Sequence, residues 1–324
     1  YSQVFFSGQV LERNLFGMGY QLGFKGTISA KSADYTATFW NPHYDDTNLG
    51  VGATLYNTSN EYSDYDKEAM GGKLLFGYPL GEYTNLSWNY RLEKYVIGDI
   101  DDDADKVIKD IEGSNWASAL YASIKRDTTD RRINPTKGNT YQFSTEYGGG
   151  ILGGDDDFVK YIADMNHYVP LFLDTVFHFH AQGGYVMKNG SERIPPFERF
   201  YLGGMNSVRG YEERTVSPLY DAKEGSEGYE EGDEKGGTKQ FFINAEYLVP
   251  LHKEMGILGV VFFDAGNAWD DDESIDFDLY KSVGAGVRWY SPLGPLRVEY
   301  GFPLDELHDE ERKGRVEFSV GQFF

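Results

Sequence analysis

The stretch "FFINAEYLV", residues 241–249, alternates apolar and polar side chains with a period of two. One face of such a segment carries Phe241, Ile243, Ala245, Tyr247 and Val249, and the other carries Asn244 and Glu246. The same rhythm recurs at 86–93, 296–302 and 315–324. A period of two is that of a β-strand, so the pattern predicts strands with one apolar and one polar face.

The alternating segments are longer than the ~5–6 residues usual for strands of water-soluble sheets. Bulky aromatic residues lie near their ends, aromatics make up 16% of the chain, and the polar faces carry charges of both signs. These features are typical of an all-β transmembrane antiparallel β-barrel, which is apolar outside, polar in the lumen and ringed by aromatic girdles. Only helices and closed barrels satisfy every backbone group in lipid.

Two kinds of connection alternate along the chain. Short turns rich in proline, glycine and asparagine are predicted at 13–18, 41–48, 79–85, 134–138, 170–174, 250–256 and 291–295. Loops of variable length and acidic character are predicted at Ser32–Ala33, 59–67, 98–113, 148–157, 188–238, 267–278 and 305–314. Because outer-membrane barrels have short periplasmic turns and long external loops, this alternation predicts 15 strands.

An odd number of strands does not close an all-antiparallel barrel. The first predicted strand, about 3–12, and the last, 315–324, both run toward the periplasmic face. We therefore expect one further strand upstream, which gives a 16-stranded barrel in the parent protein. The alternative is that one connection has been miscounted.

Composition and motifs exclude several classes of function. The chain has 324 residues, a net charge of −22 and no cysteine, so nucleic-acid binding and thiolate metal sites are not expected. No apolar run is long enough for a transmembrane helix. We find no nucleophile elbow, Walker loop or zinc-helix motif, and we predict a single, non-enzymatic barrel domain over 1–324 without metal or cofactor.

Two features leave a ligand-binding alternative open, and a third concerns mobility. His178 and His180 share one strand face and could bind a metal, but polar filling of the lumen is the favoured interpretation. The aspartate runs at 101–103, 155–157 and 270–272 could bind calcium, but they lack EF-hand spacing and are interpreted as solvated loops. Segment 221–238 is poor in apolar residues and is expected to be mobile.

An ordered set of motifs resembles the barrel domain of the BamA-type outer-membrane protein assembly factors, whose superfamily includes the two-partner-secretion transporters. The motifs are "ERNLFG" (12–17), "VRGY" (208–211), "INAEYLVPL" (243–251), "FFDAGNAW" (262–269), "GPLRVEYGFPL" (294–304) and a terminal strand that ends at Phe324. They cover the whole chain. The N-terminal POTRA domains of the family, and the strand that precedes its "ERNLFG" hairpin, are missing from this sequence.

The resemblance implies a specific site. In the family, the sixth external loop, here within 188–238, folds back into the barrel, and its motif corresponds to Val208, Arg209, Gly210 and Tyr211. It implies that Arg209 meets Glu246 and Asp264 on the inner wall. The alternation independently turns Glu246 inward, and it turns Asp264 inward if Val261, Phe263 and Ala265 face lipid.

The resemblance also implies a function. It points to an insertase that folds client β-barrels through a lateral gate between the first strand and the terminal strand, whose residues include Arg315, Val316, Glu317, Phe318, Gly321 and Phe324. The expected partners are unfolded clients, outer-membrane lipid and lipopolysaccharide, and assembly lipoproteins, but no nucleic acid. The expected location is the outer membrane of a Gram-negative bacterium, with the C-terminus facing the periplasm. The alternatives are a two-partner-secretion transporter and then a passive porin.

Overall fold

Fifteen strands form one antiparallel sheet in the structure of this chain, which is a computed structural model. The structure describes residues 5–29, 31–62, 65–100, 109–190, 194–219, 234–291, 294–308 and 311–320. Strands β1 to β15 span, in order, Phe5–Leu15, Tyr20–Ser29, Ser32–Asn41, Gly50–Glu61, Asp66–Pro79, Thr84–Gly98, Gly113–Asp127, Gly138–Gly148, Phe158–Pro170, Val176–Lys188, Lys239–His252, Ile257–Trp269, Tyr280–Ser291, Gly294–Pro303 and Arg315–Val320. Within the described ranges, four single-turn 3₁₀ helices, η1 to η4, span Tyr44–Asp46, Gly150–Leu152, Phe172–Asp174 and Pro196–Glu198. Within the described ranges, no helix has the length and apolar character needed to cross a bilayer.

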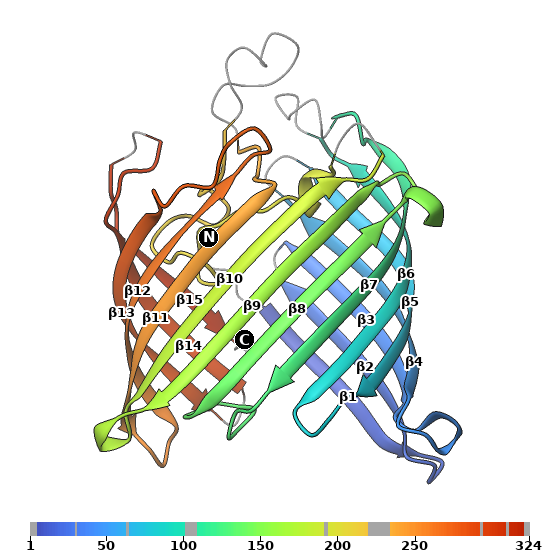
Figure 1. The fold of residues 1–324 in the computed structure, drawn as a ribbon, viewed down its shortest axis with the longest axis horizontal. Coiled ribbons are helices and arrows are strands. Elements are labelled where there is room, and N and C mark those ends of the chain that lie inside the picture. The colour runs from blue at the N-terminus through green and yellow to red at the C-terminus, as the bar shows by residue number, and fades with distance from the viewer. Residues whose placement is uncertain are drawn as a thin grey trace.

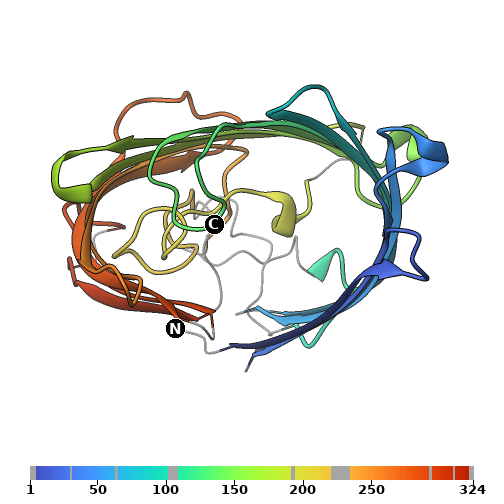
Figure 2. The ribbon, with the colours of Figure 1, turned by 90° about the horizontal axis from the view of Figure 1, so that it is seen from below.

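Every strand pairs with the next one in the chain, and the sheet curls into a barrel (Figure 1). Figure 2 looks along the barrel and shows the sheet curving around a central space, with the blue β1 and the red C-terminal strands at its two edges. Strands β1 and β15 end the strand order, and they run in the same direction because neighbouring strands are antiparallel. The predicted fold class and the count of 15 strands are confirmed.

The two faces of the sheet differ as the alternation predicts. Along β11, side chains from Lys239 to Leu248 are alternately partly exposed and buried. Large apolar side chains are exposed on the outer wall, for example Leu55 (69% exposed) on β4 and Val261 (57%) on β12. An apolar outer wall around a polar lumen is the arrangement that a lipid environment requires.

The connection between β2 and β3 corrects one prediction. Ser32–Ala33 is not a loop, because both residues already belong to β3 and pair with β4. The Ser29 and Ser32 hydroxyls lie 2.8 Å apart, and the Ser29 hydroxyl accepts a hydrogen bond from the backbone N–H of Lys31. These side-chain contacts stabilise the tight turn locally, so β3 begins and pairs with β2 directly after it.

The first hairpin is also longer than predicted. Its turn was expected at 13–18, but β1 continues to Leu15, which pairs with Tyr20 across an irregularity in the register. The other predicted connections agree with the observed strand ends to within a few residues, except the turn predicted at 134–138, which begins at residue 128 because β7 ends at Asp127. Gly321 and Phe324, the aspartate run at 101–103 and most of segment 221–238 lie outside the described residues.

Candidate functional site

The connection between β10 and β11, residues 189–238, returns into the barrel. Its described parts are tied together by isolated bridges between Phe200 and Gly237 and between Leu202 and Val216. Figure 2 shows this yellow segment inside the barrel, next to the orange and red strands. We call its tip, residues 203–215, the lumenal tip.

The motif at the lumenal tip is buried. Val208 is 0% exposed, Arg209 1% and Tyr211 4%. The Tyr211 hydroxyl lies 3.0 Å from the carbonyl oxygen of Lys281 on β13 and 3.1 Å from that of Asp305 after β14. The motif therefore packs against the wall formed by the last strands instead of extending into solvent.

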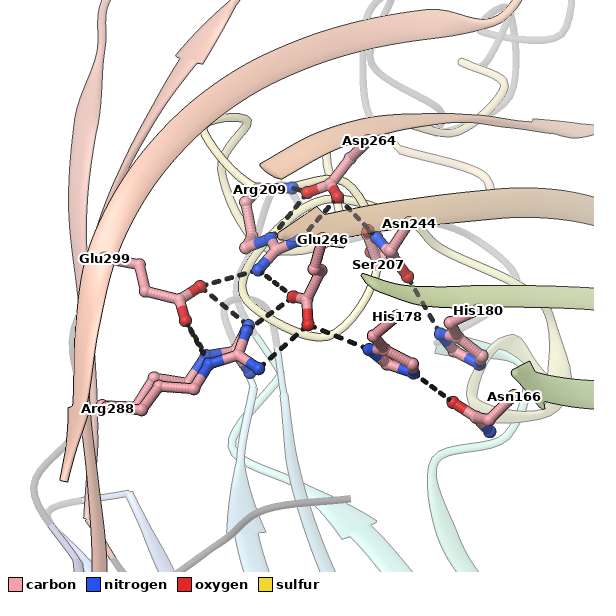
Figure 3. A network of polar contacts seen from close by, with 11 residues as sticks. Asn166, His178, His180, Ser207, Arg209, Asn244, Glu246, Asp264, Arg288 and Glu299 are labelled. Atoms are coloured by element: carbon pink, nitrogen blue, oxygen red, sulfur yellow. Dashed lines mark hydrogen bonds and ion pairs between the residues drawn. The ribbon is translucent and has the colours of Figure 1, made fainter. Parts of the chain in front are cut away.

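Arg209 meets three carboxylates (Figure 3). Its Nε and Nη2 atoms donate to the two oxygens of Asp264 at 2.7 and 2.6 Å, as a two-pronged pair. Its Nη1 atom donates to Glu246 and to Glu299, both at 2.7 Å. The backbone N–H of Arg209 also donates to Asp264, at 3.1 Å. The structure thus brings Arg209 to both predicted partners, and it adds Glu299.

Two more arginines complete this group. Arg288 on β13 donates to Glu246 at 2.9 and 2.5 Å and to Glu299 at 2.7 Å. Arg297 on β14 lies 2.8 Å from Glu299. We call Arg209, Arg288, Arg297, Glu246, Asp264 and Glu299 the lumenal ion cluster.

The lumenal ion cluster balances three guanidinium groups with three carboxylates. Moving a charged group from water into the protein interior costs on the order of several kcal/mol per ion. Only near-complete hydrogen bonding offsets this desolvation cost. Removing one partner would leave a buried charge uncompensated, at a cost of about 3–5 kcal/mol. The cluster is therefore better suited to fixing the position of the lumenal tip than to adding net stability.

The two histidines of β10 connect polar residues of β11 with polar residues of β9. His178 places Nδ1 3.0 Å from Glu246 and Nε2 2.9 Å from Asn166. His180 places Nδ1 2.9 Å from Asn244 and Nε2 2.8 Å from Asp164. All four ring nitrogens face oxygen atoms, so a metal ion would have to displace these contacts, and the described residues contain no group of three or more metal-ligating side chains.

The Asn244 partner of His180 is itself held by further hydrogen bonds. The Asn244 amide nitrogen donates to the carbonyl of Ser207 at 2.6 Å and to Asp264 at 2.8 Å, which turns its oxygen toward His180. Both ring nitrogens of His180 then face acceptors only, one amide oxygen and one carboxylate.

A second set of charges holds the beginning of the loop. Glu198 in η4 lies 3.3 Å from Lys160 on β9 and 3.7 Å from Arg91 on β6. The adjacent Phe197 ring lies 3.7 Å below the Lys67 ammonium on β5. This second anchor joins the loop to the wall opposite the lumenal ion cluster.

A third contact joins the two ends of the loop. Asp270, which follows β12, lies 3.3 Å from Arg199 and 2.7 Å from Lys235. Burial alone would raise the pKa of Asp270, but the hydrogen bond from Lys235 and the charge of Arg199 lower it. A carboxylate therefore bridges the entry and the exit of the loop.

Sequence reasoning missed most of these partners. The alternation places Arg297 and Glu299 on a polar face, but it does not show which side chains meet across the lumen. For Glu198, the only signal was an acidic residue between two aromatics in "PFERF".

The predicted terminal strand lies beside the lumenal tip. Val316 is 61% exposed on the outer wall. On the lumenal face, Glu317 accepts a hydrogen bond from the backbone N–H of Gly210 at 3.1 Å. Arg315 lies 2.7 Å from Glu212. The loop and the terminal strand are thus in direct contact.

Comparison with known proteins gives consistent results. A family model described as the Omp85 superfamily domain matches residues 14–324. The chain is 43% identical over 321 residues to the outer membrane protein assembly factor BamA of Nitratidesulfovibrio vulgaris. That match covers 98% of the chain but 40% of the relative, so the chain spans less than half of the relative's length.

Two solved structures share the fold. BamA from Haemophilus ducreyi lacking POTRA domains 1–3 superimposes with a TM-score of 0.81 at 18% identity, covering 97% of this chain and 67% of that one. CdiB from Acinetobacter baumannii superimposes with a TM-score of 0.63 at 16% identity, covering 98% and 56%. At these identities the likeness bears on the fold alone.

Proposed function

Because this chain belongs to the Omp85 superfamily, we propose that it is the barrel domain of an insertase that folds client β-barrel proteins into the outer membrane. The relative at 43% identity is named an outer membrane protein assembly factor. The observation that carries the proposal is β15, the last strand of the order, which pairs with β14 and with no further strand among the described residues.

The chemistry of a sheet edge supplies the mechanism. Backbone N–H and C=O groups at an edge pair with any strand that presents complementary groups. On β15, Val316 faces the outer wall and Glu317 the lumen, which is the pattern that a client strand must itself adopt. A client that pairs here is placed with its apolar face toward lipid, and its own burial and pairing drive the reaction without nucleotide or cofactor.

The proposal extends to partners and location. The apolar outer wall suits outer-membrane lipid and lipopolysaccharide, and the clients are unfolded β-barrel proteins. Assembly lipoproteins would act on the same machine. The short turns and the C-terminus would face the periplasm of a Gram-negative bacterium, and the large loop 188–238 would belong to the external side.

Reconstitution of the full-length protein into phospholipid vesicles tests the function. A urea-unfolded β-barrel client should fold at least about tenfold faster than in protein-free vesicles, because a template edge replaces unassisted insertion. Client folding at the protein-free rate would reject the proposal. Ion conductance without client folding would indicate a porin, and passage of a polypeptide without its insertion would indicate a transporter.

Cross-linking locates the site of action. The 324 residues contain no cysteine, so Val316→Cys introduces the only thiol of the barrel segment, at the exposed edge strand. A client with one cysteine in its terminal strand should form a disulfide with it. Leu55→Cys, on β4 and similarly exposed, is the matched control and should react far less. Equal cross-linking at both positions would argue against templating at β15.

A further inference from the structure

The pairing of β14 with β15 contains an unfavourable match. In this register, Glu299 lies directly opposite Glu317. Glu299 is 1% exposed, and both carboxylates lie on the lumenal face. Like charges directly opposite one another destabilise a sheet.

The lumenal tip lies at this pair of carboxylates. Arg209 Nη1 donates to Glu299, and the next backbone N–H, that of Gly210, donates to Glu317. The other oxygen of Glu317, Oε2, is buried without a hydrogen-bond partner among the described residues. Glu317 therefore depends on the loop for its hydrogen bonding in the described part of the chain.

Close backbone packing places the tip there. A Cβ atom at Gly301 on β14 would lie 2.6 Å from the Gly210 nitrogen, so a side chain at this position would push the tip away. Gly210 has φ +92°, which favours glycine, and its own Cβ would lie 2.8 Å from the Gly301 carbonyl carbon. The tip thus spans β14 and β15 and supplies one charge and one N–H to the two carboxylates.

We propose that docking of the lumenal tip holds β15 on the barrel wall, and that Glu317 is the positioning residue through which this coupling acts. When the tip is docked, both carboxylates are compensated. When it withdraws, Glu317 loses the Gly210 N–H and Glu299 keeps only Arg288 and Arg297. The repulsion across the pair is then less compensated, and β15 separates more readily. That release of β15 would open a lateral gate for clients rests on the proposed function. The coupling itself concerns only contacts within this chain.

The coupling predicts a specific rescue. Hydrogen exchange of peptides that contain 315–320 is measured on the full-length protein in phospholipid vesicles without client. Arg209→Gln should accelerate this exchange about tenfold, because it withdraws the compensating charge. Adding Glu317→Gln removes the repulsion, so the double variant should return to within about threefold of the wild type. Glu68→Gln, an exposed position on β5, is the control and should not rescue.

A second variant covers the case in which Arg209→Gln does not fold. Gly301→Ala displaces the tip without changing any charge, and the same acceleration and the same rescue by Glu317→Gln are expected. The coupling is overturned if neither variant accelerates exchange of β15, or if Glu317→Gln fails to restore it. Client folding in the same vesicles is a separate readout, so rescue without any client folding would reject only the proposed function.

Discussion

Arg209 and Phe262 lie face to face in the lumen, with the Arg209 Cζ atom 3.6 Å from the centroid of the Phe262 ring. The ring covers the guanidinium while Glu246, Asp264 and Glu299 take its edges. A planar, forked cation fits this environment, whereas an ammonium offers neither the two-pronged pair with Asp264 nor a flat surface for the ring. The site therefore selects arginine and not positive charge alone.

Arg209→Lys tests that selectivity. We expect the docked position of the lumenal tip to lose about 2–4 kcal/mol, because buried carboxylates remain without their hydrogen bonds. Limited proteolysis of loop 194–219 in vesicles should then be clearly faster than in the wild type. Arg209→Glu should release the loop further and impair client folding while the barrel still forms. Wild-type protease resistance in both variants would show that this contact does not hold the loop.

The second anchor should act separately from the lumenal ion cluster. Glu198→Gln removes the ion pairs with Lys160 and Arg91, and it should loosen the start of the loop by about 1–2 kcal/mol because these groups are only partly exposed. Hydrogen exchange should increase at 194–202 but not at 207–211. Glu112→Gln, an exposed residue before β7, is the matched control. Equal acceleration at both segments would mean that the loop opens as one unit.

The sequence was sufficient for the architecture because strand alternation and turn chemistry are local. Residues 241–249 identify the two faces of β11, and the turns around prolines mark the strand ends. One exception, Ser32–Ala33, arises because a tight turn with serine side-chain contacts leaves almost no loop to detect. Local patterns therefore locate strands well, but short external connections less well.

The site could be predicted only in part, because its partners meet across the lumen. The family resemblance linked Arg209 to Glu246 and Asp264. Glu299 and Arg288 join them only because the register and the curvature of β11 to β14 bring the four strands around one guanidinium. No periodicity within a single strand carries that information.

Packing of the lumenal tip depends on the missing side chain of Gly266 on β12. A Cβ atom there would lie 2.5 Å from Phe242 Cβ and 3.0 Å from a methyl group of Val208. Gly266→Ala should therefore cost about 1–3 kcal/mol through overpacking and increase exchange at 207–211. Gly183→Ala on β10 is the matched control, because a Cβ atom there would lie 4.0 Å from its nearest neighbours. Similar effects of the two substitutions would point to strand flexibility as the cause.

Asp156 makes the loop between β8 and β9 sensitive to pH. It is 5% exposed and accepts a hydrogen bond from the Tyr95 hydroxyl at 2.7 Å. Burial raises the pKa of Asp156 to about 6 even though this hydrogen bond lowers it. The charge of Glu198 also raises the pKa, whereas Lys67 and Arg91 lower it. The folded loop thus binds a proton more tightly than the open loop, whose carboxyl has the ordinary value of 3.8.

The direction of the pH effect follows from linkage. Because the folded pKa is raised, the closed loop loses stability as the pH rises from about 3.8 through about 6, and the loss is complete above that. Between pH 5 and 7.5, opening of residues 149–157 should increase about tenfold after correction for the intrinsic exchange rate. Asp156→Asn keeps a polar group beside Tyr95 but cannot ionise, so its profile should be flat over this range. A flat profile in the wild type would contradict the raised pKa of Asp156. An unchanged slope in Asp156→Asn would assign the titration to another group, because the substitution alters no other ionisable group.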